Sequence, residues 1–186
     1  MDVGLRELLE PFAAAGLWDG APVSPVGAED LPAVYRPLLD HGRDMTGTLE
    51  GRFGGPLTLR PIAMRTENDV CLRRVVLASG ERTVEYGAIR IHLDAFGPAA
   101  RERILEGRVP LGAILRDEGV EHACRALGFF SVPADALAAT GLDAGVSERL
   151  YGRVARLSAG DGRVLAEVVE VLPGLEEEGA EEDGGR

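Results

Sequence analysis

Residues 70–93 read VCLRRVVLASGERTVEYGAIRIHL, and this stretch decides the fold class. Its two halves are rich in Val, Ile, Leu and Tyr, and the short SGER segment that joins them has the composition of a tight turn, which is typical of a β-hairpin. A further strand pattern precedes it at 57–66, a short one follows at 128–133, and a second hairpin occupies 150–172. At least five strands with short connections predict a largely antiparallel sheet.

Helical patterns surround these strands. Residues 5–18 carry apolar side chains at helical spacing, and Pro11 marks a break or kink. Asp44 is a candidate N-cap of a short helix, while Pro98 and Gly107 have the residue types that begin and end another. The sequence therefore predicts an α+β domain with helices at one face or at the ends of the sheet.

Length and composition set the domain organisation. The chain has 186 residues, of which 45% are hydrophobic, and this suits one domain with a sizeable core. From residue 174 onward the sequence GLEEEGAEEDGGR carries six acidic residues and one arginine. We expect a single domain over 1–173 and an acidic, solvated tail over 174–186.

The charged residues exclude several function classes. The net charge is −11, which disfavours a nucleic-acid partner, and all 20 basic residues are arginine. Without lysine the chain has no amine for a Schiff base or a P-loop. Three histidines without paired spacing and two cysteines predict no metal site and no disulfide framework. With no membrane-spanning stretch and no signal peptide, we expect a cytoplasmic protein.

The strands carry isolated charges on apolar faces. Alternation places Arg73 on one face with Cys71 and Val75, and Arg74 on the other face. Two apolar faces indicate a sheet that is covered on both sides, where an inward charge is costly unless it is paired or bound to a ligand. From the residues alone, these charges either reach water near strand ends, pair with each other as Arg73 with Glu167, or line a site.

An ordered set of motifs extends over residues 40 to 173: RDMTGTLE (43–50), CLRRVVL (71–77), YGAIRIHLDAF (86–96), RERILEGRVPLGAIL (101–115) and GDGRVLAEV (160–168). This set resembles the chorismate lyase family, in its bacterial hydroxybenzoate-forming branch. The resemblance implies an antiparallel sheet of about six strands with helices on one face and an internal ligand cavity under helical flaps. It also implies a lyase that eliminates pyruvate from chorismate to give 4-hydroxybenzoate, as part of aromatic compound biosynthesis in secondary metabolism, with no cofactor.

The resemblance also assigns site residues. Arg73 falls on the arginine that binds a substrate carboxylate, and Glu167 on the late glutamate that holds the 4-hydroxyl end, so these two are the candidate catalytic residues. Met45 and Leu111 fall on two further substrate contacts. Arg90 is a candidate for the enolpyruvyl carboxylate, since the family's arginine on this strand falls on Ala88, two residues earlier on the same face.

The chemistry suits these roles, because arginine binds a carboxylate at two points and keeps its charge. Among rival residues, Glu170 lies on the other face from Glu167 and is expected to be solvated near Pro173. His41 and His92 are expected at the surface, and Cys71 in the core.

Two alternative functions remain open. One is a non-catalytic aromatic-carboxylate-binding domain of the same fold, like the effector-sensing domains of some bacterial transcription regulators. Such domains normally follow a basic DNA-binding segment, and only two arginines occur in the first 40 residues, which disfavours this hypothesis. The other is a same-fold enzyme for another cyclic carboxylic acid. For the lyase we expect chorismate as the small-molecule partner, no nucleic acid, no membrane, and a monomer or weak homodimer.

Overall fold

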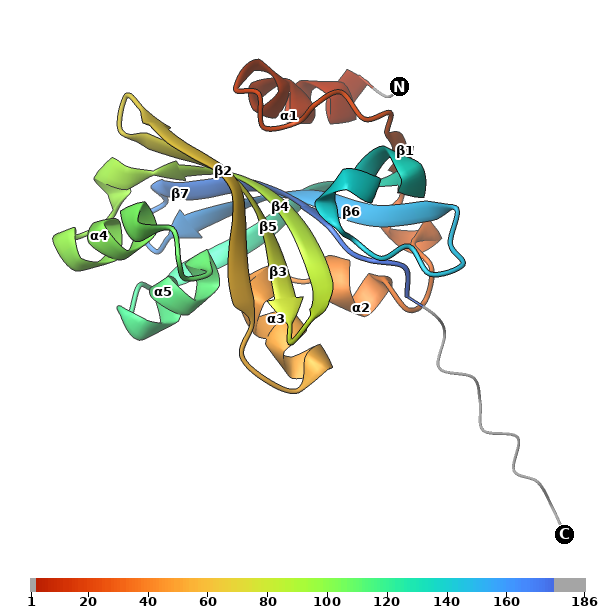
Figure 1. Ribbon diagram of the computed structural model, residues 1–186. Coiled ribbons are helices and arrows are strands. Elements are labelled where there is room, and N and C mark those ends of the chain that lie inside the picture. Colours follow the sequence, from red (N-terminus) through yellow and green to blue (C-terminus); the bar gives the residue numbers. More distant parts are fainter. Residues whose placement is uncertain (1–2, 176–186) are drawn as a thin grey trace, which may run out of the picture.

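The computed structural model describes residues 3–175, and a seven-stranded antiparallel sheet is its centre (Figure 1). The strand order is β1-β5-β6-β7-β4-β3-β2. The strands are β1 (Ser24–Val26), β2 (Thr58–Glu67), β3 (Val70–Ser79), β4 (Arg82–His92), β5 (His122–Pro133), β6 (Arg149–Ala159) and β7 (Val164–Val171). The predicted α+β fold with a large antiparallel sheet is confirmed.

Tight turns make the hairpins. Gly80 joins β3 to β4 with φ +60°, and Gly162 lies between β6 and β7 with φ +86°, both in the left-handed region that suits glycine. Asn68 and Asp69 also have positive φ between β2 and β3, and both residue types tolerate this region. The two hairpins meet where β7 pairs with β4, so one continuous sheet results.

Two strands differ from the sequence expectation. Residues 24–26 are outside the strand patterns predicted from the sequence, yet they form β1 along the edge of β5. β5 begins six residues before the expected strand at 128, because it pairs with β6 from His122 to Pro133. Tertiary pairing thus overrides a local sequence that shows little strand pattern.

Five α-helices accompany the sheet: α1 (Val3–Ala14), α2 (Arg36–Leu39), α3 (Met45–Phe53), α4 (Pro98–Glu106) and α5 (Leu111–Asp117). The expected caps are present: the Asp44 carboxylate accepts a hydrogen bond from Gly47 N at 2.9 Å, and α4 begins at Pro98 and ends at Gly107, where φ is +66°. Three short 3₁₀ helices are η1 (Ala28–Asp30), η2 (Leu93–Ala95) and η3 (Ala134–Thr140).

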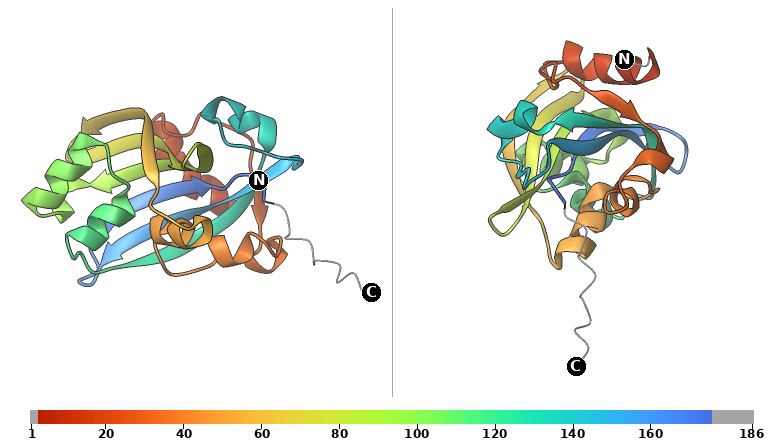
Figure 2. Two further views of the ribbon diagram at one scale, coloured as in Figure 1. Left: turned by 60° about the horizontal axis from the view of Figure 1, so that its bottom comes forward. Right: turned by 90° about the vertical axis from the view of Figure 1, so that its right-hand side faces the viewer.

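Helices cover both faces of the sheet, as the two apolar faces of its strands predicted. α2 to α5 lie on one side, and α1 lies on the other (Figures 1 and 2). The α1 side has its own apolar core, in which Phe12, Leu17 and Trp18 pack against the sheet. Residues 3–40 therefore belong to the same folded unit as the sheet.

The end of the described chain still packs on the domain. Gly174 N donates to Asp143 O at 2.7 Å, and Leu175 N donates to Tyr35 Oη at 3.0 Å. The rest of the expected acidic tail lies outside the described residues. Among residues 3–175 there is no helix long and apolar enough to cross a membrane.

We expect Phe12→Ala to lower the free energy of unfolding by about 3–5 kcal/mol, because it leaves a cavity between α1 and the sheet. Urea unfolding followed by circular dichroism measures this value. Glu10→Ala, at an exposed position of the same helix, is the control and should change stability by less than about 0.5 kcal/mol. Similar small changes in both variants would show that α1 is not part of the cooperative unit.

Candidate functional site

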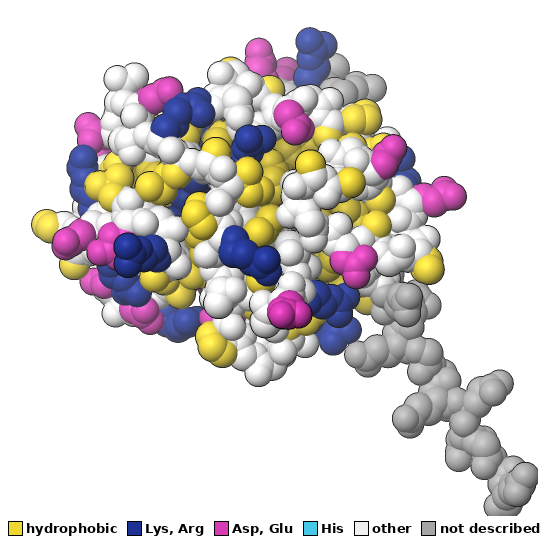
Figure 3. Space-filling model, in the orientation of Figure 1, with side chains coloured by type: hydrophobic (Ala, Val, Ile, Leu, Met, Phe, Trp, Pro, Cys, Tyr) yellow, Lys and Arg dark blue, Asp and Glu magenta, His cyan; other side chains and the backbone are white. Residues whose placement is uncertain are grey.

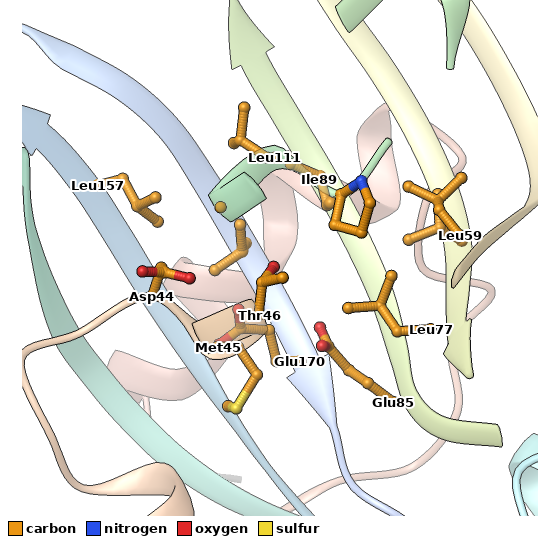
Figure 4. A pocket seen from close by; sticks show the side chains of 14 residues that line it. Asp44, Met45, Thr46, Leu59, Leu77, Glu85, Ile89, Leu111, Leu157 and Glu170 are labelled. Carbon is orange, nitrogen blue, oxygen red and sulfur yellow. The ribbon is translucent and has the colours of Figure 1, made fainter. Parts of the chain in front are cut away.

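A cavity lies between the sheet and the N-terminal ends of α3 and α5 (Figure 4). Its walls come from β2, β3, β4, β6 and β7, and its roof from the segments that begin the two helices. The lining residues are Asp44, Met45, Thr46, Leu59, Val75, Leu77, Glu85, Ile89, Pro110, Leu111, Gly112, Leu157, Val168 and Glu170. Apolar side chains dominate, and three carboxylates are among them.

The free volume of the cavity is about 30 Å³, room for about two water molecules. The roof is closed by direct packing of the two helix starts, since a side-chain carbon added to Gly112 would overlap the Asp44 carboxylate and come within 2.8 Å of Thr46. Glycine at 112 is therefore what lets α5 approach α3 this closely.

Strand register arranges the floor in successive levels. Arg73 lies opposite Ile89, which lies opposite Val168. At the next level Gly87 pairs with Glu170, which pairs with Arg153 of β6. At the last level Glu85 pairs with Leu77. One end of this floor therefore carries a cation and the other carries carboxylates.

Arg153 and Glu170 form a buried ion pair at the middle level. Arg153 Nε donates to Glu170 Oε2 at 2.6 Å, and the Arg153 side chain is 0% exposed. The other guanidinium nitrogens donate to the carbonyl oxygens of Leu39, His41 and Arg43 at 3.0 to 3.3 Å. This one side chain thereby fixes the segment that leads into α3.

Burial and the adjacent Arg153 both lower the pKa of His41, which favours its neutral form.

Glu85 is the second buried carboxylate. Its Oε2 atom has no hydrogen-bond partner within residues 3–175. The carboxylate folds back over Gly87, because Oε1 lies 3.3 Å from the position that a side-chain carbon of Gly87 would occupy. Burial and, next, the nearby Glu170 carboxylate raise the pKa of Glu85 well above its ordinary value, while Arg153 acts in the opposite direction.

Arg73 is buried on the same face, with 1% of its surface exposed. None of its three guanidinium nitrogens has a hydrogen-bond partner among the described residues. It neighbours the cavity through Ile89, directly opposite, and Val75, two residues along its own strand, and both of these line the cavity. Burial lowers the pKa of this guanidinium from its ordinary value.

The structure brings together three of the residues singled out in the sequence. Met45 and Leu111 line the cavity, and Arg73 lies beside it. Cys71 is buried on the same face as Arg73 and belongs to the same apolar core. Arg74 extends from the opposite face, where it interacts with Tyr86.

Glu167 and Arg90 lie on the other face of the sheet. They are opposite each other in the register of β7 and β4, and Arg90 Nη1 donates to Glu167 Oε2 at 3.0 Å. His92 and Arg156 also contact Glu167, at 3.2 Å and 3.6 Å. The expectation that Glu167 faces Arg73 across one cavity is therefore wrong. Of the two glutamates of β7, Glu170 is the one on the cavity side, although it was expected to be solvated.

No protein-family model and no curated protein matches this chain at a significant level. Several solved structures do match this chain. The effector domain of PhnF from Mycobacterium smegmatis matches with a TM-score of 0.51 and 13% identity, over 81% of this chain and 92% of that one. A second structure of PhnF matches with a TM-score of 0.51 and 14% identity, over 91% of this chain and 79% of that one. The C-terminal domain of the histidine utilization repressor from Pseudomonas syringae pv. tomato is a looser match, with a TM-score of 0.42 and 14% identity over 67% and 97%.

The chain has the chorismate-lyase-like fold of these effector domains. The interpretation as a chorismate-cleaving enzyme is corrected, because the similar solved structures are effector domains of transcription regulators and none of those described above is a lyase. The same finding overturns the expected roles in pyruvate elimination and aromatic biosynthesis. The lyase hypothesis also required Arg73 and Glu167 to face one cavity, and the register places Glu167 opposite Arg90 on the other face of the sheet.

We expect Arg153→Met to reduce the free energy of unfolding by about 3–5 kcal/mol, because it leaves Glu170 buried without its cation. Chemical denaturation measures this change. The control is Arg156→Met, three residues along the same strand, where 46% of the arginine side chain is exposed. Equal effects of the two substitutions would contradict a buried ion pair as the tie between sheet and roof.

Glu85 makes stability depend on pH in a defined direction. Its pKa is higher in the folded than in the unfolded chain, so its contribution is favourable at low pH and is lost as the pH rises through the folded-state pKa. We therefore expect the free energy of unfolding to fall as the pH rises above about 4, the ordinary range of glutamate. Glu85→Gln should flatten this decline, and denaturation curves between pH 5 and pH 9 would measure it. An unchanged pH profile in the variant would refute this account.

Proposed function

We propose that the chain is a ligand-binding effector domain for a small organic anion, with an aromatic carboxylate as the ligand class. The observation that carries this proposal is the Arg73 guanidinium, which is buried and unpaired within residues 3–175 beside a small cavity. The fold supports it, because the similar solved structures include effector domains.

An unpaired buried guanidinium destabilises a folded protein. Removing an ion from water costs several kcal/mol unless a partner of opposite charge and hydrogen-bond acceptors replace the water. No carboxylate in the described chain contacts Arg73, and the pKa of Arg73 is influenced only by burial and by Cys71. A ligand carboxylate supplies what is missing, since its two oxygens match the two-point geometry of a guanidinium.

The walls of the cavity suit a flat ring. Leu59, Ile89 and Leu111 surround the cavity from three different elements, and Leu157 closes another side (Figure 4). Ligand pockets are commonly lined in this way, by apolar side chains with a few polar groups that set orientation. On the outer face shown in Figure 3, arginines and carboxylates are instead interspersed, with no gathering by sign.

Ligand entry requires the roof to move. The free volume of about 30 Å³ is far below the volume of typical ligand pockets, about 300–1,000 Å³. An aromatic acid fits only if the starts of α3 and α5 separate. Binding would then favour an open arrangement of the roof over the closed one, and such a shift in populations is how a ligand changes the output of an effector domain.

We expect Arg73→Met to weaken the binding of benzoate and 4-hydroxybenzoate by about 2–5 kcal/mol, because the ligand carboxylate loses its charged partner. Titration calorimetry measures the affinities, and Arg74→Met on the opposite face is the matched control. The ligand-free Arg73→Met variant should also be more stable than the wild type, since it removes an uncompensated buried charge. Wild-type affinity in this variant, or no binding of either acid to the wild type, would overturn the proposal.

A further inference from the structure

The end of the cavity away from Arg73 carries more negative than positive charge. Glu85 and Glu170 line it, with Arg153 as the cation beside them, while Asp44 lies nearer Leu157 (Figure 4). Figure 4 shows the Glu85 and Glu170 side chains converging near Thr46. Glu170 is paired with Arg153, and Asp44 caps α3 and lies 3.7 Å from His122 Nε2. Glu85 is left without a cation of its own.

Arg153 has no hydrogen-bond donor left for Glu85. Its Nε donates to Glu170, and its two terminal nitrogens donate to three backbone carbonyls. The other groups that face Glu85 do not compensate it either: Glu170 of β7 and Asp44 before α3 repel its charge, and its neighbours Val75 and Leu77 on β3 are apolar. The Glu85 carboxylate therefore needs either a proton or an external cation.

A metal ion does not fit this place. Within residues 3–175 there is no cluster of three or more His, Cys, Asp or Glu side chains that could hold one. The three carboxylates share the cavity without converging on a common point. An organic cation, which a single carboxylate can bind, is the alternative that matches the geometry.

We propose that Glu85 binds a protonated amine of the ligand, so that the ligand is a small zwitterion with its anionic group at Arg73 and its ammonium group at Glu85. This inference rests on the proposed function. Arg73 and Glu85 lie on the same face, two levels apart in the register of β3 and β4. Four residues along a strand span about 13 Å. Two long side chains that reach inward from this separation leave room for one ring between their charged groups.

A ligand hydroxyl is the competing partner for Glu85. A hydroxyl would satisfy the unpaired Oε2 atom but would leave the excess negative charge of this end unchanged. An ammonium group satisfies the oxygen and balances the charge together, and hydrogen bonds between two charged groups are stronger than those with a neutral partner. The ammonium is therefore the better match.

Three probes that differ in one group test the proposal: 4-(aminomethyl)benzoate, 4-(hydroxymethyl)benzoate and 4-ethylbenzoate. We expect titration calorimetry on the wild type to give about tenfold or greater preference for the aminomethyl compound over the ethyl compound. Glu85→Gln and Glu85→Met should both remove this preference while the ethyl compound still binds. Glu81→Gln, at an exposed position of the same hairpin, should retain it.

Proton release gives a second readout. Burial and Glu170 raise the pKa of Glu85, so at a pH below this raised pKa the carboxyl group releases its proton when the ammonium binds. The binding heat of the aminomethyl compound should then differ between buffers of different ionisation enthalpy, in the wild type and not in Glu85→Gln.

The outcomes separate the two proposals. Equal affinities for all three probes, or a preference for the hydroxymethyl compound, overturn the ammonium site while the carboxylate site at Arg73 stands. Absence of binding by all three probes overturns both.

Discussion

The buried pair between Arg153 and Glu170 holds the cavity together. The guanidinium belongs to β6, its carboxylate partner to β7, and its remaining donors bind the backbone between α2 and α3. Asp44, Met45 and Thr46 follow directly on that backbone and form part of the roof. One side chain thus sets the height of the roof above the sheet, and it is satisfied by hydrogen bonds at every nitrogen, which a buried cation requires.

Two further buried charges have no such compensation. Arg73 has no hydrogen-bond partner and Glu85 has one unpaired carboxylate oxygen among the described residues, and they lie at opposite ends of one sheet face. Stability alone would favour apolar side chains at both positions, as at Val75 and Ile89 beside them. The two extensive apolar cores on either side of the sheet offset this cost. Uncompensated charges in an otherwise well-packed domain are characteristic of binding sites, where the ligand completes the pairing.

Local patterns in the sequence predict the elements but not how strands align with each other. The hairpin turns, the Asp44 cap and the ends of α4 follow from residue types, and alternation correctly separates Arg73 from Arg74. Alternation within a strand does not tell which face is shared with a neighbouring strand. That depends on register: β7 pairs with β4 so that Glu167 lies opposite Arg90 and Glu170 lies opposite Gly87. Glu167 and Glu170 therefore exchange their expected environments. Glu85 could have been found, because it has the same parity as Gly87, Ile89 and Ile91 and is the one charged residue on that face of β4.

The motif resemblance implied both a fold and an activity, and only the fold is supported. The motifs correspond to structural positions, since Met45 and Leu111 line the cavity and Arg73 adjoins it, and these positions are compatible with binding alone. What the chain adds is a connection between ligand and roof. A ligand that contacts Glu85 also changes the electrostatic field at Glu170, and Glu170 is the partner of the side chain that holds residues 39–43. Under the proposed function, a change of charge at Glu85 would alter the contacts that hold the start of α3, the segment that must move for a ligand to enter. Recognition and opening would then depend on the same pair of carboxylates, a coupling through which an effector domain responds to a ligand.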